Sequence, residues 1–413
     1  MPERAAPVPP PSPVIRGGPE ITAVPPGSEV ARPAAPSGDM AFDAWRSDFL
    51  RRAPAEVRSV LARELAGVTP DARVLTSDLG QPEFSQPVGS YVQKTVGADR
   101  IATGRRARER VPELSAVQSR FGVPAEIVVA VWGMETAYGS IKGDQDVIRS
   151  LATLAAQGRR RDWAEAQLIA SARIIMAGEA TRAQLRGSWA GAMGHTQFIP
   201  ETYLTRAVDG NGDGRRDIWN NEADALHSAA NLLSQAGWRR GGSWAVEVLL
   251  PASGFDYSVT ETLAARPSDW AARGVRRADG RPWSPVDAES DARLILPAGA
   301  RGPAFLTFPN HMAIRAYNNS TSYALAVGLI ADGLRGEPPL RTPWPSEQPL
   351  SIADRRAAQA ALTQLGFNVG AIDGVIGAGT RAAVRSWQQS RGRPADGYVD
   401  AGTIAALRRE AGN

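Results

Sequence analysis

Proline-rich segments at two places divide the chain before any other pattern is considered. Of the 31 prolines, 11 precede Met40 and five lie in the run GEPPLRTPWPSEQP, from Gly336 to Pro349. Proline has no backbone N–H, so such a run cannot continue a helix or a central strand. We therefore expect four parts: a disordered Pro-rich tether over residues 1–40, a main domain over 41–336, a linker over 337–349 and a small domain over 350–413.

The pattern of apolar residues predicts that the main domain is mostly helical. Its first helix begins at FDAWRSDFL, where Phe42, Trp45 and Phe49 recur at helical spacing. The section from Trp244 to Pro309 differs, because the short runs WAVEVLLP, ARLILP and AFLTFP alternate with glycine and proline turns. We therefore expect a mainly α domain that carries a small β-containing insertion.

The small domain is predicted to be a bundle of three helices. The first covers about 352–365, the second about 380–390, and the third begins after Asp400, a suitable N-cap, and ends near Arg409. The residues predicted to form its core are Leu362, Ile372, Val384, Trp387 and Leu407.

Composition excludes several kinds of protein. The 413 residues include 43% hydrophobic and 22% charged residues and no cysteine, which is typical of a globular protein without disulfides or thiolate metal sites. The net charge of +4 is not gathered into a basic stripe, so we expect no nucleic-acid partner. No run is long and apolar enough for a transmembrane segment. We also expect the protein to be a monomer. The N-terminus has no apolar core of a signal peptide, so the protein is cytoplasmic or its export signal lies upstream of this numbering.

One glutamate lies within an apolar helix. In FGVPAEIVVAVWGMETAYG, where Gly139 fits the end of the helix, Glu135 shares a helical face with Val128, Val131, Trp132 and Tyr138. Removing a carboxylate from water raises its pKa and lets it hold a proton near neutral pH. This is the property that a general acid needs to protonate a glycosidic oxygen. The alternative is a glutamate at a helix end, turned outward or paired with an arginine.

Two further stretches suggest a sugar-binding surface. GSWAGAMGHTQFIPETY, from Gly187 to Tyr203, combines small residues that permit close approach with neutral polar and apolar side chains. AYNNSTSYALAVGLI, from Ala316 to Ile330, has two tyrosines around a polar segment. The alternatives are a tight turn between helices for the first stretch, and a capped helix with packed tyrosines for the second.

Taken together, these stretches resemble the signatures of the lytic murein transglycosylase B family (MltB-like, glycoside hydrolase family 103). QPEFSQPVGSYV and SLATLAAQGRRRDW add to the resemblance, which covers about residues 41–336 in collinear order. It implies a lysozyme-like, α-rich fold. It also implies cleavage of the β-1,4 bond between N-acetylmuramic acid and N-acetylglucosamine in peptidoglycan. His195-Thr196 departs from the family, whose members often have Tyr-Gly there.

The resemblance also implies roles for particular residues. Glu135 corresponds to the single catalytic acid and base of the family, which needs no cofactor for its chemistry. The family's substrate groove corresponds to Ser188, Met193, Gln197, Tyr317, Asn318, Tyr323, Arg159 and Arg160. Most glycosidases use two carboxylates. A single acid suits a mechanism in which the C6 hydroxyl of the muramoyl residue attacks its own C1 and gives a 1,6-anhydromuramoyl end.

An acidic loop, DGNGDGRRDIWNNEAD, partly matches a calcium-binding EF-hand. Asp209, Asn211 and Asp213 fit the first three ligand positions and Arg215 offers its carbonyl, but the twelfth position is Asn220 rather than glutamate. In the resembling family the last ligand comes later, where this chain has Asp224. We expect a structural Ca²⁺ here; the alternative is a turn rich in Asx and glycine that binds no metal.

The C-terminal segment, from AAQAALTQLGF to DGYVDAGTIAAL, resembles the three-helix peptidoglycan-binding domain that accompanies cell-wall enzymes. Such a module would hold the protein on peptidoglycan glycan strands. These resemblances indicate a periplasmic lytic transglycosylase. The alternatives are a non-catalytic peptidoglycan-binding scaffold, a hydrolytic muramidase and a calcium-sensing EF-hand protein.

Overall fold

The computed structural model describes residues 37–79 and 86–412, and Ala34–Asn413 form one compact unit. The tether predicted over 1–40 lies almost wholly outside the described residues, as does most of the QPEFSQ motif. The first expected helix is confirmed: Phe42, Trp45 and Phe49 on α1 are buried at 0%, 4% and 1% exposure.

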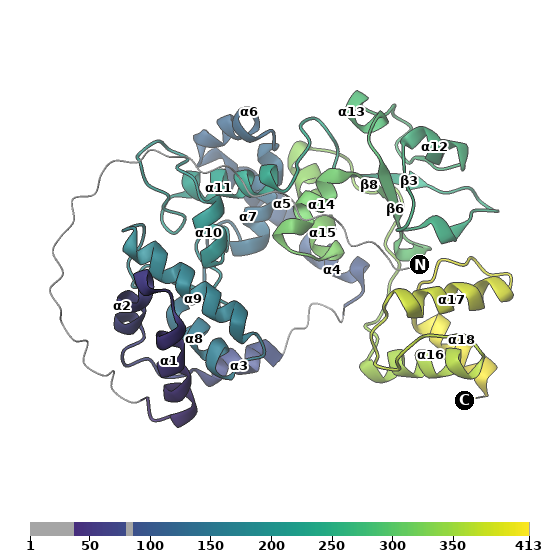
Figure 1. Ribbon diagram of the computed structural model, residues 1–413. Coiled ribbons are helices and arrows are strands. Elements are labelled where there is room, and N and C mark those ends of the chain that lie inside the picture. The colour runs from purple at the N-terminus through teal and green to yellow at the C-terminus, as the bar shows by residue number, and fades with distance from the viewer. Residues whose placement is uncertain (1–36, 80–85, 413) are drawn as a thin grey trace, which may run out of the picture. The chain divides into compact units, whose positions relative to one another are not determined.

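Most of the main domain is helical (Figure 1). The helices before the insertion are α1 (Met40–Arg52), α2 (Ala55–Glu64), α3 (Ala72–Leu79), α4 (Val88–Thr95), α5 (Ala98–Glu109), η2 (Pro112–Ala116), α6 (Val117–Phe121), α7 (Ala125–Thr136), α8 (Val147–Gln157), α9 (Arg161–Met176), α10 (Pro200–Arg206) and α11 (Glu222–Gln235). The insertion contains η3 (Tyr257–Val259), α12 (Pro267–Ala272) and α13 (Pro285–Ala288), and is followed by α14 (Pro309–Tyr317) and α15 (Thr321–Arg335).

The described strands other than β7 fall into two antiparallel sheets. A two-stranded sheet pairs β1 (Gln145–Asp146) with β2 (Arg186–Gly187). A five-stranded sheet has the order β4-β6-β8-β3-β5. The strands of the insertion are β3 (Ala245–Leu249), β4 (Ala264–Ala265), β5 (Arg276–Arg277), β6 (Ala292–Ile295), β7 (Pro297–Ala300) and β8 (Ala304–Thr307). The three longest β-like runs of the sequence correspond to β3, β6 and β8, so the predicted insertion is confirmed.

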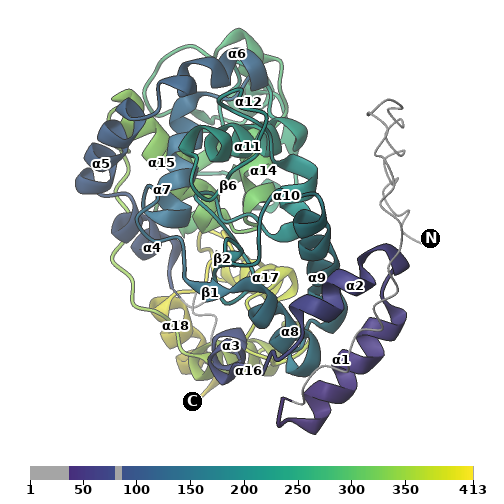
Figure 2. The same ribbon diagram turned by 90° about the vertical axis from the view of Figure 1, so that its left-hand side faces the viewer.

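Two hydrophobic cores support the helical part of the domain. One joins α1 and α2 to α8 and α9, which lie side by side in Figures 1 and 2. The other surrounds α7, which packs along α15. Among the described residues, no single helix has the length and hydropathy to cross a membrane, although η2–α6 and α7, bent by 114°, meet that test together.

The C-terminal module is the predicted bundle of three helices, α16 (Ile352–Gln364), α17 (Ala378–Ser390) and α18 (Ala401–Ala411). Leu362, Val384, Trp387 and Leu407 are fully buried. The prediction for Ile372 is wrong, because its side chain is 46% exposed. The loop between α16 and α17 contains three glycines with positive φ, and Val369 packs into the core instead. The fold class, a mainly α protein with a lysozyme-like domain and a helical C-terminal module, is confirmed.

Candidate functional site

Helix α7 carries the predicted acid at the end of a buried apolar segment. Val128, Val131 and Trp132 have no exposed surface, whereas Glu135 is half-buried. The helix begins after Pro124, whose fixed φ suits a helix start and whose missing N–H costs nothing there. Burial of the apolar face fixes the rotation of the helix, and this rotation sets the direction of the Glu135 side chain.

The helix ends earlier than the sequence predicts. It stops at Thr136, and Ala137 and Tyr138 both adopt positive φ, at 47° and 62°. Tyr138 therefore leaves the face of Glu135; its hydroxyl donates to the carbonyl of Arg100 at 2.8 Å. Such φ values are unfavourable for residues with a Cβ, so surrounding contacts must hold this turn in place.

Those contacts come from the Gly187–Pro200 loop. The Thr136 hydroxyl donates to the carbonyl of His195 at 2.7 Å, and it accepts from the amide of Gly139 at 3.0 Å. Gly139 has φ +85°, and a Cβ there would lie 2.5 Å from Nδ1 of His195. Glycine is therefore required where the chain leaves α7 and passes the imidazole ring.

Tyr323 connects the third stretch to the predicted acid. Its hydroxyl donates to Oε1 of Glu135 at 2.6 Å across 188 residues of sequence. Tyr323 lies in the first turn of α15, where its amide donates to the Ser320 side chain that caps the helix. Burial, followed by the nearby charge of Glu135, raises the pKa of Tyr323 well above its ordinary value. Tyr323 is therefore a protonated hydrogen-bond donor to the carboxylate throughout the neutral range.

Tyr317 joins the same centre from the end of α14. Its hydroxyl donates to the carbonyl of Thr196 at 2.5 Å, and its ring packs on Phe198. Burial and then the charge of Glu135 raise its pKa well above the ordinary value. Asn318, half-exposed, caps the end of α14 beside it. All three stretches singled out from the sequence therefore meet around Glu135.

The loop residues predicted to bind substrate differ in exposure. Ser188 is half-buried, and its hydroxyl accepts from the amide of Ala192 at 3.1 Å. Gln197, also half-buried and at φ +50°, donates to the carbonyl of Lys142 at 3.0 Å. Met193 has no exposed surface and packs in the core. A Cβ on Gly187 would lie 1.9 Å from the carbonyl oxygen of Ala192, so this glycine makes room for the protein's own backbone.

His195 contacts Trp132 and the turn that ends α7, and the sequence analysis did not predict these contacts. Nε1 of Trp132 donates to its Nδ1 at 3.2 Å, which requires the neutral ring because an accepting nitrogen carries no proton. Burial, then the positive charges of Lys142 and Arg110, lower the pKa of His195 to about 4. The sequence signal was present, since His195-Thr196 is where the chain departs from its resembling family.

Arg159 and Arg160 lie in the turn between α8 and α9. Both pair with Asp78 on α3, whose side chain is 5% exposed, at 3.4 and 3.3 Å. The guanidinium of Arg160 also lies 5.6 Å from the ring centre of Trp189, the neighbour of Ser188. The pair therefore adjoins the Ser188 end of the loop, and Asp78, which the sequence did not single out, orients it.

The acidic loop is held by its own backbone. Asp209 accepts from the amides of Gly212 and Gly214 at 2.6 and 2.8 Å, and Asp213 accepts from the amide of Arg215. Asp224, fully buried, accepts from the amides of Gly210 and Asp217. The Asn211 amide donates to Asp213. Within the described ranges, no three or more His, Cys, Asp or Glu side chains are gathered in a group that could hold a metal ion.

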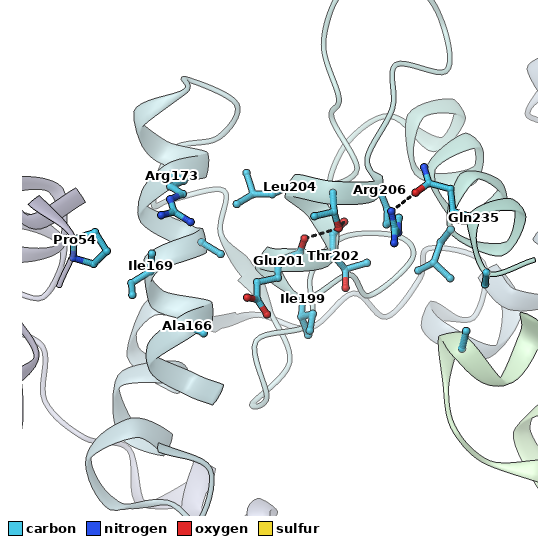
Figure 3. Close-up of a pocket in the computed structure, with 15 residues that line it drawn as sticks. Pro54, Ala166, Ile169, Arg173, Ile199, Glu201, Thr202, Leu204, Arg206 and Gln235 are labelled. Carbon is cyan, nitrogen blue, oxygen red and sulfur yellow. Dashed lines mark hydrogen bonds between the residues drawn. The ribbon is translucent and has the colours of Figure 1, made fainter. Parts of the chain in front are cut away.

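A pocket of about 750 Å³ lies away from these residues, between α9, α10 and α11 (Figure 3). Its charged side chains are already paired: Arg206 hydrogen-bonds to Gln235, and Arg173 pairs with Glu56 at 3.1 Å. None of the residues predicted to act on a substrate lines it. Cavity size alone therefore does not locate the chemistry in this molecule.

Comparison with known families follows the two-domain division. Residues 41–332 match the family described as "Transglycosylase SLT domain", and residues 351–407 match "Putative peptidoglycan binding domain". The membrane-bound lytic murein transglycosylase B of Escherichia coli K12 is 34% identical over 209 residues. That match covers 50% of this chain and 56% of the relative, so the chain spans about half the length of the curated relative it matches.

Solved structures extend the similarity over both domains. SltB3 from Pseudomonas aeruginosa, in complex with NAG-anhNAM-pentapeptide, is 45% identical with a TM-score of 0.82, covering 90% of this chain and all of that one. The lytic transglycosylase Slt35 of Escherichia coli, in complex with calcium, is 26% identical with a TM-score of 0.62, covering 76% and 98%. The predicted family is thus confirmed by sequence and by structure, and the chain belongs to the transglycosylase SLT domain family, with a C-terminal domain of the peptidoglycan-binding family.

Proposed function

We propose that this protein is a lytic transglycosylase of peptidoglycan with Glu135 as its single acid and base. The observation that carries the proposal is the 2.6 Å hydrogen bond from the Tyr323 hydroxyl to Glu135, at the point where three distant stretches meet. Membership of the family and the likeness to a structure holding NAG-anhNAM-pentapeptide support it. The carboxylate is fixed in direction by burial of α7 and by a buried donor, as proton transfer requires.

The proposed reaction has two proton transfers. Protonated Glu135 donates to the leaving oxygen of N-acetylglucosamine as the C1–O bond breaks, and the muramoyl N-acetyl carbonyl stabilises the developing positive charge. The carboxylate then accepts the proton of the muramoyl C6 hydroxyl while O6 bonds to C1. The product is a 1,6-anhydromuramoyl end, and Glu135 is again protonated. No acidic residue occurs in Gly187–Pro200 or Tyr317–Ile330, which favours a single-carboxylate mechanism over the usual pair.

The mass of the products tests this proposal. Purified sacculi digested with the protein should release disaccharide-peptides that are lighter by one water molecule than those released by a hydrolytic muramidase. Hydrated products would establish the muramidase alternative. If a folded preparation bound sacculi but released no fragments, the protein would be a non-catalytic scaffold.

We propose that substrate lies along Ser188, Gln197, Tyr317, Asn318 and Tyr323, with Arg159 and Arg160 at one end of the groove. Met193, which has no exposed surface, would support this groove from beneath. The C-terminal module would keep the enzyme on the glycan strands. The location of this polymer favours a periplasmic protein. We further propose that the protein acts as a monomer.

We also propose that the acidic loop takes Ca²⁺ as a structural ion. The alternation of Asp209, Asn211 and Asp213 and the calcium complex of Slt35 support it. On binding, the loop carboxylates would give up their hydrogen bonds from backbone amides and coordinate the ion instead. Addition of millimolar Ca²⁺ after chelation should raise the melting temperature. At a hundredfold excess of Ca²⁺ over Kd, the free energy of unfolding should increase by about 2.7 kcal/mol. An unchanged melting temperature would contradict the proposal.

A further inference from the structure

A second pocket lies between the C-terminal module and the main domain, which belong to one compact unit. It has a volume of about 550 Å³. Five parts of the chain line it: Gln86–Val88 at the start of α4, the β-containing insertion, including Arg301, Thr321 at the start of α15, the linker residues Ser346–Gln348, and the module, including Arg355 and Arg381. The pocket is therefore formed only when both domains are present.

This pocket is close to the proposed catalytic centre. Thr321 lines it, and Tyr323, two residues later on the same helix, donates to Glu135. Two residues advance a helix by about 3 Å. The first turn of α15 therefore contributes both a residue of the pocket wall and the hydrogen-bond donor to Glu135.

The pocket has unsatisfied polar groups of both kinds. Nine buried side-chain nitrogen or oxygen atoms have no hydrogen-bond partner among the described residues, and three of them belong to residues lining it: Glu347 Oε1, Arg355 Nε and Arg381 Nε. The Glu347 side chain is 8% exposed. Its Oε1 forms an ion pair with Arg301 at 3.6 Å, beyond hydrogen-bond distance, and its other oxygen accepts from the Tyr398 hydroxyl at 2.6 Å. An unsatisfied buried polar atom costs about 1–3 kcal/mol, so such a concentration indicates a missing ligand.

The arginines of the pocket are not equivalent. Arg301 pairs with Asp400, and Arg381 lies 3.4 Å from Glu261. Across residues 37–79 and 86–412, no carboxylate or carbonyl pairs with the side chain of Arg355, which is half-buried on α16. A guanidinium without a partner at a pocket wall is suited to a carboxylate, which it binds with two parallel hydrogen bonds.

We propose that this pocket binds the stem peptide of the peptidoglycan substrate, with Arg355 on a peptide carboxylate. The inference rests on the proposed function, since the peptide arrives attached to the glycan at Glu135. A stem pentapeptide, as in the SltB3 complexes, ends in a carboxylate and extends about 17 Å at most. The module would thus recognise the stem peptide beside the cleavage site, in addition to binding the polymer.

Matched variants of neighbouring arginines test the inference. Arg355→Gln is compared with Arg356→Gln, the next residue on α16, which is exposed and does not line the pocket. Each is assayed on soluble glycan oligomers with pentapeptides and on the same oligomers after removal of the peptides. Arg355→Gln should raise KM for the peptide-bearing substrate about tenfold with kcat unchanged, the value of one charge-assisted contact. KM for the peptide-free substrate should stay within about twofold, and Arg356→Gln should change neither. Arg355→Glu, with an equal melting temperature, should raise KM further.

Two results would overturn the inference: unchanged KM for Arg355→Gln on both substrates, or equal increases on both. Failure of the proposed function is distinguishable, because the unmodified protein would then cleave neither substrate. In that case calorimetric titration with free pentapeptide decides the pocket: binding lost in Arg355→Gln supports it, and no binding to the unmodified protein refutes it.

Discussion

The end of α7 and the acidic loop both present carboxylates that the sequence singled out, but they are built in opposite ways. Glu135 receives its hydrogen bond from Tyr323, 188 residues away, and the turn after it is held by the loop carrying His195. The carboxylates of Asp209 and Asp213 accept from amides no more than five residues away. The first site is assembled by the whole fold, whereas most of the second could form in a short peptide.

This difference predicts how strongly substitutions should alter the geometry of each site. A site assembled from distant segments depends on every contact that positions it, so changes that touch no substrate still alter its geometry. A locally closed loop loses only its own hydrogen bonds when one member is changed. The following predictions test this contrast, from the largest expected effect to the smallest.

Glu135→Gln should lower the release of fragments from purified sacculi by about 10²- to 10⁴-fold, because it removes the group that transfers the proton. Glu126→Gln provides the control, since Glu126 lies on the same helix but pairs with Arg108 at the surface. Activity retained by Glu135→Gln, with the melting temperature unchanged, would disprove the assignment.

Tyr323→Phe should reduce kcat by about tenfold or more, since a hydrogen bond to a charged group contributes about 1.5–3 kcal/mol. Loss of a donor to the carboxylate also favours its protonated form, so the limb of the pH–rate profile that reports deprotonation of the acid should move to higher pH. Tyr317→Phe, whose hydroxyl donates to a backbone carbonyl, should leave that limb in place. A common shift in both variants would argue against a specific role for Tyr323.

Gly139→Ala should lower the free energy of unfolding by about 1–3 kcal/mol, because it combines a positive φ with a Cβ placed 2.5 Å from the His195 ring. Gly178→Ala is the matched control: φ is +69°, but nothing lies within 4 Å of the added Cβ. The difference between the two variants in chemical denaturation isolates the ring contact. Equal losses would mean that His195 does not brace the turn.

His195 should make stability depend on pH. Burial, then Lys142 and Arg110, lower its pKa from 6.5 to about 4, so the unfolded chain binds a proton that the folded protein does not. The contribution is complete above pH 6.5 and is lost as the pH falls toward 4. His195→Gln should flatten this slope in urea unfolding, leaving the parts due to His227 and His311. Burial lowers the pKa of both, that of His311 to about 4. An unchanged slope would show that His195 is not the titrating group.

Asp209→Ala should have the smallest effect on catalysis. Turnover should stay within about twofold, since the loop's contacts are local, while any rise in melting temperature with Ca²⁺ should disappear. A large loss of turnover at saturating substrate would mean that the loop and the Glu135 centre are coupled, and would remove the contrast drawn above.

Much of the fold follows from local patterns. Helical spacing located α1 and the three helices of the module, and alternation with turns located the β insertion. Ile372 was misplaced because periodicity cannot tell which of two nearby apolar residues a glycine-rich loop turns inward; Val369 packs in the core.

The site was predictable in its members but not in its connections. An apolar stripe and motif resemblance pointed to Glu135, Tyr317 and Tyr323, yet the helix was extended past Thr136 because nothing local forbids it there. The early end of α7 depends on the Thr136–His195 hydrogen bond, which spans 59 residues. Asp78 and the pocket beside Arg355 likewise depend on which distant segments meet, and a single sequence does not encode such encounters as a visible pattern.

The turn after Glu135 also bears on motion. Helix ends ordinarily fray, because their last carbonyls lack partners. Here the amides of Tyr138 and Ile141, just past the last residue of α7, donate back to the carbonyls of Trp132 and Thr136, both of which are buried. Because Tyr138 is buried, we expect its amide hydrogen to exchange with solvent only when the core around α7 opens. The proposed acid, Glu135, is therefore attached to a slowly opening helix, and on this proposal the movements that admit a polymer strand occur in the elements around α7.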